Sequence, residues 1–173
     1  VITNCIFSGN GIIGSTGAIS FFTQNNGIYT ASITNCLFYQ NSSIFGGGIR
    51  IHKTTGNINF TNCTFYNSSS IVMDEYTIGD PVPVFKNCIN WSPYYFFIGP
   101  AGSSINVTNS LIRGGYAGTG NISSNPFFAD ASNPKGPDNI WGTSDDGLKQ
   151  MPISAVIDNG SASGAPATDI TGN

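Results

Sequence analysis

The chain has 173 residues and a formal net charge of −3, and only 9% of its residues are charged, against about 25% in an average soluble domain. The few Lys and Arg residues are scattered and form no basic stripe, so nucleic acid is not an expected partner. No apolar run approaches the ~20 residues of a membrane helix, so no membrane span is expected.

A short motif returns along the first two thirds of the chain. The segment 2–7, Ile-Thr-Asn-Cys-Ile-Phe, returns at 33–38 and 60–65 and, in weaker form, at 85–89 and 107–111. A second, weaker repeat lies between these copies, at 17–21, 48–51, 71–73 and 95–98. All the copies are short, rich in β-branched or aromatic residues, and bounded by Gly, Asn, Ser or Pro, which predicts a series of strands joined by turns.

The repeat length selects the architecture. Its central Asn recurs after 31, 27, 25 and 22 residues. The Leu pattern of leucine-rich repeats is absent, and a propeller blade needs about 40 residues or more. A coil of three strands and three turns fits, so we expect an all-β, right-handed parallel β-helix of five to six coils over residues 1–128. Residues 129–173 would form a loop-rich segment that caps the open end of the solenoid.

Equal positions in successive coils should stack into ladders. The five repeated Asn residues would form one ladder at a bend, because Asn tolerates left-handed backbone angles and stacked amides can bond to one another. They are Asn4, Asn35, Asn62, Asn87 and Asn109. The four cysteines, Cys5, Cys36, Cys63 and Cys88, each follow a ladder Asn, and Ser110 takes the fifth place. Four Cys could form disulfides, but their equal phase favours small side chains that fill an inner corner.

Several motifs carry a family resemblance. The FxxN segments 7–10 and 38–41, together with Gly46-Gly47-Gly48-Ile49, resemble repeats of polymorphic outer-membrane proteins. The segments 125–130, 141–148, 155–158 and 167–173 are similar to the end of bacterial secreted β-helix proteins called choice-of-anchor proteins, although Met151-Pro152-Ile153-Ser154 departs from the usual turn. The resemblance implies an extracellular, bacterial cell-surface location and a longer parent protein with an anchor after residue 173.

An aromatic column is the best candidate for ligand binding. Three residues after each ladder Cys stand Ser8, Tyr39, Tyr66 and Trp91, and Arg113 stands in the equivalent place after Ser110. Because the preceding Phe38 and Phe65 should point inward, we expect the column to point outward. Such a stripe could stack on sugar rings or pack against a partner protein. It could equally stack on itself or lie beneath a loop such as 93–97.

An enzyme of the polysaccharide lyase or glycoside hydrolase type is the alternative function. Glycosidases generally need two carboxylates about 5–9.5 Å apart. Residues 1–73 contain no Asp or Glu, so Asp74 and Glu75 are the first candidates. If Ile49 stacks on Ile71, His52 lies over Asp74 and Lys53 over Glu75. These pairs could act as an acid–base site, or they could be surface ion pairs that contribute little stability. Arg50 and Arg113 are too isolated to nominate as a lyase base.

The acidic residues of the C-terminal third are candidate ligands of Ca²⁺. Asp130, Asp138, Asp145 and Asp146 lie among Gly and Pro within 17 residues. Hard cations suit loops with several carboxylate and carbonyl oxygens, but the spacing is not that of an EF-hand. The alternative is a solvated loop without metal. No other cofactor is expected.

These patterns favour a binding or structural role over catalysis. We expect a rigid β-helix stalk or adhesin segment that presents its aromatic face to a glycan or to a surface protein. Self-association of coils with other chains in a larger assembly is a further expectation.

Overall fold

The computed structural model describes residues 1–11, 17–22, 30–43, 48–52, 56–75 and 77–171. The described residues form fourteen short strands and no helix, so this part of the chain contains no helix able to cross a membrane. The strands are β1 Ile2–Thr3, β2 Ile6–Ser8, β3 Ile19–Phe21, β4 Ala31–Thr34, β5 Leu37–Tyr39, β6 Ile49–Ile51, β7 Ile58–Thr61, β8 Thr64–Tyr66, β9 Ile71–Met73, β10 Val84–Lys86, β11 Ile89–Trp91, β12 Phe97–Ile98, β13 Asn106–Thr108 and β14 Leu111–Ile112.

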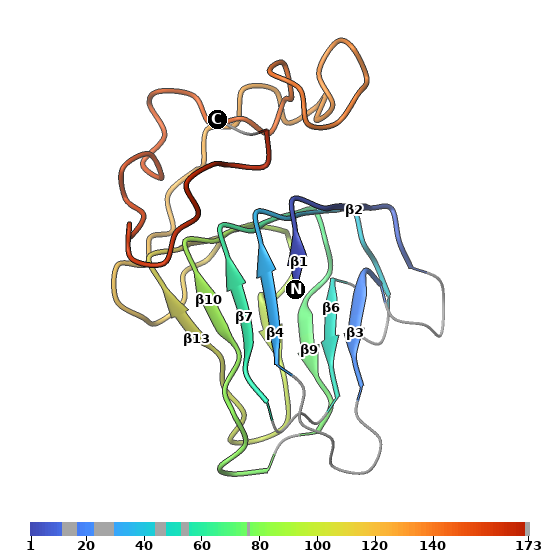
Figure 1. Cartoon of the computed structure of the whole chain (residues 1–173), viewed down its shortest axis with the longest axis vertical. Coiled ribbons are helices and arrows are strands. Elements are labelled where there is room, and N and C mark those ends of the chain that lie inside the picture. Colours follow the sequence, from blue (N-terminus) through green and yellow to red (C-terminus); the bar gives the residue numbers. More distant parts are fainter. Residues whose placement is uncertain (12–16, 23–29, 44–47, 53–55, 76, 172–173) are drawn as a thin grey trace.

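Every third strand joins the same sheet, which makes the fold a parallel β-helix (Figure 1). The first sheet has the order β1-β4-β7-β10-β13, the second β2-β5-β8-β11-β14 and the third β3-β6-β9-β12. The register follows the repeat, since Ile33 pairs with Ile2 on one side and with Phe60 on the other. The predicted fold is confirmed. The described strands make four complete coils and a fifth with two strands, slightly fewer coils than the five to six expected.

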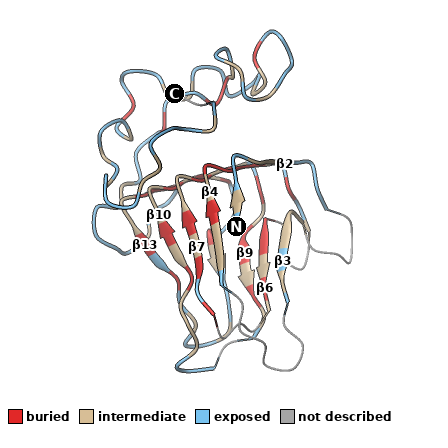
Figure 2. Ribbon diagram, in the orientation of Figure 1, coloured by how far each residue is buried: buried red, intermediate tan, exposed pale blue. Residues whose placement is uncertain are grey.

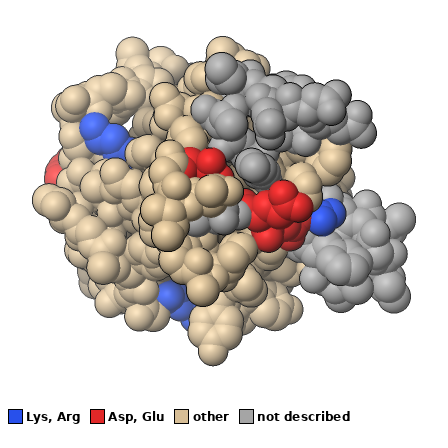
Figure 3. Space-filling view, turned by 90° about the horizontal axis from the view of Figure 1, so that it is seen from below, with Lys and Arg blue, Asp and Glu red and all other residues tan. Residues whose placement is uncertain are grey.

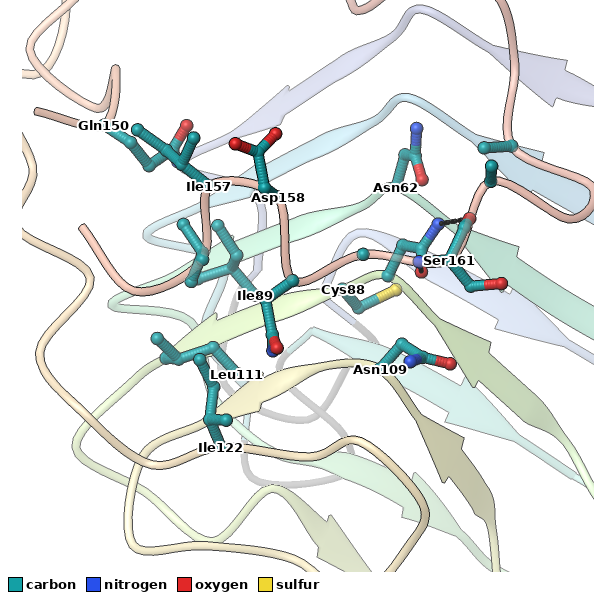
Figure 4. Close-up of a pocket in the computed structure, with 16 residues that line it drawn as sticks. Asn62, Cys88, Ile89, Asn109, Leu111, Ile122, Gln150, Ile157, Asp158 and Ser161 are labelled. Carbon is teal, nitrogen blue, oxygen red and sulfur yellow. Dashed lines mark hydrogen bonds between the residues drawn. The ribbon is translucent and has the colours of Figure 1, made fainter. Parts of the chain in front are cut away.

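The repeated Asn residues lie at the bend between the first and second sheets. All five have a left-handed backbone, with φ between 49° and 53°. Asn accepts this conformation at lower cost than most residues, because its short amide can bond locally. Asn35 Nδ2 donates to Asn4 Oδ1 at 3.2 Å. The predicted ladder position is confirmed. Figure 4 shows Asn62 and Asn109 in this column, with the C-terminal segment passing beside it.

Stacked Phe rings fill the interior of the coils. Phe38 lies 4.7 Å from Phe65, and Phe60 lies 4.5 Å from Phe85, in each case as nearly parallel rings. All four rings are buried. The two stacks meet edge to face, since the ring centroids of Phe60 and Phe65 are 6.1 Å apart at an angle of 62°. Figure 2 shows that burial is concentrated in the central strands. This packing supplies the main apolar stabilisation of the coils.

The cysteines fill the inner corner beside the Asn bend. All four are free thiols, and Cys36, Cys63 and Cys88 are buried, as the repeat predicts. Each Sγ donates to the carbonyl two residues earlier, as Cys88 does to Lys86 at 3.3 Å. Ser110 repeats this bond with Thr108 at 2.8 Å and accepts a bond from Cys88 N. The place therefore suits any small side chain that can donate to that carbonyl.

The C-terminal segment lies along the flank of the coils. In Figure 1 it runs above the ends of the first-sheet strands, and its residues 156–161 line a pocket together with Leu111 of the last coil. Its Ser161 bonds Asn87 of the fourth coil, and its Thr168 carbonyl accepts from Asn35 of the second. Residues 129–173 are expected to cap the open end of the solenoid, and these bonds place the described part of the segment against the side of the coils. At the open end itself, Ile122, which follows β14 by ten residues in sequence, pairs with Leu111 of that strand.

Candidate functional site

The aromatic column forms on the outer surface of the second sheet. The register places Ser8, Tyr39, Tyr66 and Trp91 side by side on β2, β5, β8 and β11. The rings of Tyr39 and Tyr66 are stacked with centroids 6.1 Å apart and planes at 3°. The preceding Phe38 and Phe65 point into the core, which gives the column its outward direction.

Part of the column is covered by the C-terminal segment. Trp141 meets Tyr39 edge to face at 5.2 Å, and Phe128 meets Tyr66 in the same way at 5.4 Å. Tyr66 Oη also donates to the Ala131 carbonyl at 3.5 Å. Burial raises the pKa of the Tyr39 phenol, and the neighbouring Tyr66 adds to the effect. The two tyrosines thus pack within the molecule, beneath residues 128–141 and not beneath 93–97.

The last two members of the column remain next to an open surface. The guanidinium carbon of Arg113 lies 5.5 Å from the Trp91 ring centroid, which is a cation–π distance. Arg113 follows β14 directly and is exposed. Its backbone N donates to the Asn90 carbonyl at 2.9 Å, which fixes it beside the coil that carries Trp91.

Arg113 also lines a pocket of about 710 Å³ between the loop after β11 and the turn after β14. Tyr94 and Tyr95 at its edge are 56% and 82% exposed. Phe96 is buried against Tyr116, with ring centroids 5.8 Å apart at an angle of 86°. This pair anchors the loop to the core and leaves the two tyrosines outside it.

We call the lining residues Tyr94, Tyr95, Arg113 and Tyr116, together with Trp91, which contacts Arg113 beside them, the aromatic pocket. The repeat predicted Trp91 and Arg113 as ligand-binding residues, but it did not nominate the three tyrosines. Tyr95 begins the weak repeat copy 95–98, but that repeat indicates a strand and not an exposed ring, and Tyr94 and Tyr116 lie outside the repeated segments. The run Pro93-Tyr94-Tyr95-Phe96-Phe97, with four aromatic residues in one loop, is the signal that could have found them.

The alternative catalytic residues gather on the outer surface of the third sheet. Ile49 pairs with Ile71, as expected, and this brings His52 to Asp74 with Nδ1 and Oδ2 3.5 Å apart. His52 Nε2 lies 3.7 Å from Glu75 Oε1. Arg50, which sequence analysis set aside as isolated, donates to Asp74 Oδ2. Lys53 lies outside the described residues.

We call Arg50, His52, Asp74 and Glu75 the charged cluster, and its side chains pair with one another. Asp74 contacts both Arg50 and His52, and its side chain is about one fifth exposed. The exposed ring of Phe22 stacks on His52 at 4.7 Å and covers one of its faces. Figure 3 shows that charged side chains are sparse on the surface seen from below. Opposite charges in mutual contact are a common arrangement of surface ion pairs, which contribute about 0–1 kcal/mol each to stability.

The acidic residues proposed for calcium are largely engaged within their own loop. Asp130 Oδ1 accepts from the N and Oγ of Ser132, and Asp145 Oδ1 accepts from Thr143 Oγ1 at 2.6 Å. These bonds hold the pKa of both carboxyls below the usual range. Asp138 Oδ1 accepts from Ile140 N and Asp146 Oδ2 from Gly142 N, each at 2.8 Å. Within the part of the chain that the structure describes, no three His, Cys, Asp or Glu side chains gather as metal ligands do.

The fold and the two surface groups define a parallel β-helix with an aromatic pocket near its last coils and a charged cluster on a separate sheet. No protein-family model, curated protein or solved structure matches the chain.

Proposed function

We propose that the chain is a non-catalytic, extracellular β-helix segment of a bacterial surface protein, and that it binds carbohydrate through the aromatic pocket. The observation that carries the proposal is the exposure of Tyr94 and Tyr95 at a pocket that Arg113 also lines. Large aromatic rings are normally withdrawn from water, and exposed groups of them mark interaction sites.

The chemistry of the pocket suits a sugar. Aromatic rings offer flat apolar faces for the C–H side of a pyranose, while the tyrosine hydroxyls and the Arg113 guanidinium can bond its hydroxyl groups. The underlying coils are held by parallel strand pairing and by the Phe stacks, so the rings stand on a rigid support. A rigid support lowers the entropic cost of binding.

An extracellular location is supported by composition and by the resemblance of the repeats. The surface is polar through Asn, Ser, Thr and Gly, and only 9% of residues are charged. A β-helix that extends by adding coils suits a stalk or adhesin, whose binding groups must stand away from the cell.

The test is a glycan and polysaccharide panel scored for both binding and product release. We expect binding without release, and a loss of about tenfold in affinity, or ~1.4 kcal/mol, for Tyr95→Ala, Arg113→Ala and Trp91→Ala. Ile78→Ala is the matched control, because Ile78 is also exposed and apolar but does not line the pocket. Binding that is unaffected by the three pocket variants would show that the sugar lies elsewhere.

Catalysis is the second candidate, and the position of His52 between Asp74 and Glu75 is the observation in its favour. A lyase or hydrolase would release products from the panel and lose that activity in Asp74→Asn. A purely structural cluster would leave the sugar panel unchanged in the same variant and would lose only stability.

A further inference from the structure

A second pocket, of about 290 Å³, lies between the Asn ladder and the C-terminal segment. We call it the ladder pocket. Asn35 and Asn62 line it from the bend of the second and third coils, and Trp141, Asp146 and Asp169 line it from the C-terminal segment. It is therefore formed only when the segment lies against the coils. It is separate from the aromatic pocket, with which it shares no lining residue.

The ladder pocket collects buried oxygen atoms without hydrogen-bond partners. Among the described residues, four buried side-chain N or O atoms have none, and three of these belong to residues that line this pocket. The three atoms are Asn35 Oδ1, Asn62 Oδ1 and Asp146 Oδ1. A buried acceptor without a donor costs about 1–3 kcal/mol, and native proteins contain few of them. Three in one small pocket indicate that a ligand supplies what they lack.

The orientation of the Asn35 amide is fixed by its other bonds. Its nitrogen donates to the Thr168 carbonyl at 2.7 Å and to Asn4 Oδ1 at 3.2 Å. The Thr168 carbonyl can only accept, so the nitrogen of Asn35 must face it and the other atom of the amide must be Oδ1. The residue is only 6% exposed. Its unpaired atom is thus an acceptor, and a flip of the amide would break two bonds.

The electrostatics of the pocket favour a positive ligand. Asp146 contributes a carboxylate to the lining, and its Oδ1 is buried without a hydrogen-bond partner. Asp169 adds a further carboxylate, which also accepts from Thr171 N at 2.8 Å. The basic residue of the lining, Lys149, is exposed.

We propose that the ladder pocket binds a hard divalent cation of the Ca²⁺ type, with the amide oxygens of Asn35 and Asn62 and the carboxylate of Asp146 as its protein ligands. Ca²⁺ takes 6–8 oxygens, and amide, carboxylate and water oxygens are its usual partners. Because these ligands come from both the coils and the C-terminal segment, the ion fastens the segment to the coils.

Terbium luminescence tests the proposal directly, since Tb³⁺ replaces Ca²⁺ and is excited by energy transfer from a nearby Trp. Trp141 lines the pocket. We expect Trp-excited terbium emission that Ca²⁺ displaces and that Na⁺ does not. Trp141→Phe should abolish most of this emission, while Ca²⁺ still raises the melting temperature by about 5–10 °C at a hundredfold excess over its Kd.

Two substitutions remove proposed ligands and two serve as controls. Asp146→Asn and Asn62→Gly should weaken Ca²⁺ binding by at least about tenfold. Gly is used at position 62 because its backbone φ is 53°. Asp130→Asn is the control for Asp146→Asn, because Asp130 does not line the ladder pocket. Asn109→Gly is the control for Asn62→Gly, because Asn109 is a ladder residue that does not line it either. Both controls should keep wild-type affinity.

The opposite pattern would overturn the proposal. If Asp130→Asn or Asp138→Asn abolishes binding and Asn62→Gly does not, the ion is held by the acidic loop alone. If Ca²⁺ neither displaces terbium nor raises the melting temperature of the wild-type chain, the pocket is not a cation site. Neither result bears on sugar binding at the aromatic pocket, so failure of one proposal leaves the other standing.

Discussion

Asn35 and Thr168 are 133 residues apart in sequence and are joined by a hydrogen bond of 2.7 Å from the Asn35 side chain to the Thr168 carbonyl. Asn87 makes two such bonds with Ser161, each of 2.8 Å, through its Nδ2 and its Oδ1. The Asn residues therefore have two tasks. Their backbone turns each coil, and their side chains hold the C-terminal segment in place.

The first prediction concerns this attachment. Asn87→Gly keeps the left-handed backbone but removes both bonds to Ser161, each of which contributes about 1 kcal/mol net. We expect proteases to cleave residues 155–171 faster than in the wild-type chain, while the coils stay intact. Asn109→Gly is the control, since Asn109 has the same left-handed backbone (φ 49°) and, among the described residues, its side chain makes no hydrogen bond to the C-terminal segment. Equal cleavage rates in the two variants would contradict the attachment.

The second prediction concerns the core. Phe60 is fully buried, stacks on Phe85 and meets Phe65 edge to face. Phe60→Ala should lower the free energy of unfolding by about 3–5 kcal/mol, because it removes a large apolar side chain and leaves a cavity. Urea denaturation followed by intrinsic fluorescence measures the change. Ile78→Ala, at a site that is 91% exposed, should stay within about 0.5 kcal/mol of the wild type.

The third prediction concerns the thiols. Burial raises the pKa of Cys63, and the neighbouring Cys88 raises it further, so the thiolate needed for alkylation is scarce. Cys36 is shifted in the same direction, mainly by Cys63 and by burial. In the folded chain we expect Cys5, which is half-buried, to react with iodoacetamide first. The other thiols should react only after denaturant is added. Rapid labelling of Cys63 without denaturant would show that the inner corner is open.

The sequence predicted those features that repeat from coil to coil. A fixed phase places Asn35, Cys36 and Tyr39 at the bend, the inner corner and the outer surface, and the structure has all three there. Parallel pairing forces equal positions to stack, so one copy of the motif predicts the next. Parallel pairing also predicted that His52 lies beside Asp74, because the two residues directly follow the paired strands β6 and β9.

Features that occur once could not be predicted in this way. The contacts of Trp141 with Tyr39 and of Phe128 with Tyr66 join a segment without repeats to the coils. Nothing in the spacing of residues 127–171 indicates which coil each one meets, because the segment runs beside the ladder on irregular turns. The ladder pocket depends on that path. Its acidic ligand Asp146 was among the residues predicted to bind calcium, but its partners Asn35 and Asn62 were assigned only to the ladder.

The last prediction concerns pH and rests on Asp146. Its pKa is raised above the ordinary value of 3.8 in the folded chain, chiefly by burial and further by Asp138 and Asp145. The folded state then holds this proton more tightly than the unfolded state does. The stability associated with protonated Asp146 is therefore complete below pH 3.8 and is lost as the pH rises through the folded-state pKa.

Asp146→Asn cannot ionise, so without added metal we expect it to be more stable than the wild type at neutral pH and equally stable at acid pH. Asp130 titrates in both chains, and its contribution cancels in the difference between variant and wild type. Removal of the Asp146 charge also relieves its repulsion with Asp138 and Asp145, which stabilises the variant further at neutral pH. Saturating Ca²⁺ should reverse the order at neutral pH, because only the wild type has the charged ligand that holds the ion. Melting temperatures measured across pH, with Ca²⁺ or with a chelator, check both signs. A variant that stays more stable than the wild type in Ca²⁺ would show that Asp146 is not a ligand of the cation. Burial of the ionised Asp146 would then destabilise the fold without any bound ion to offset it.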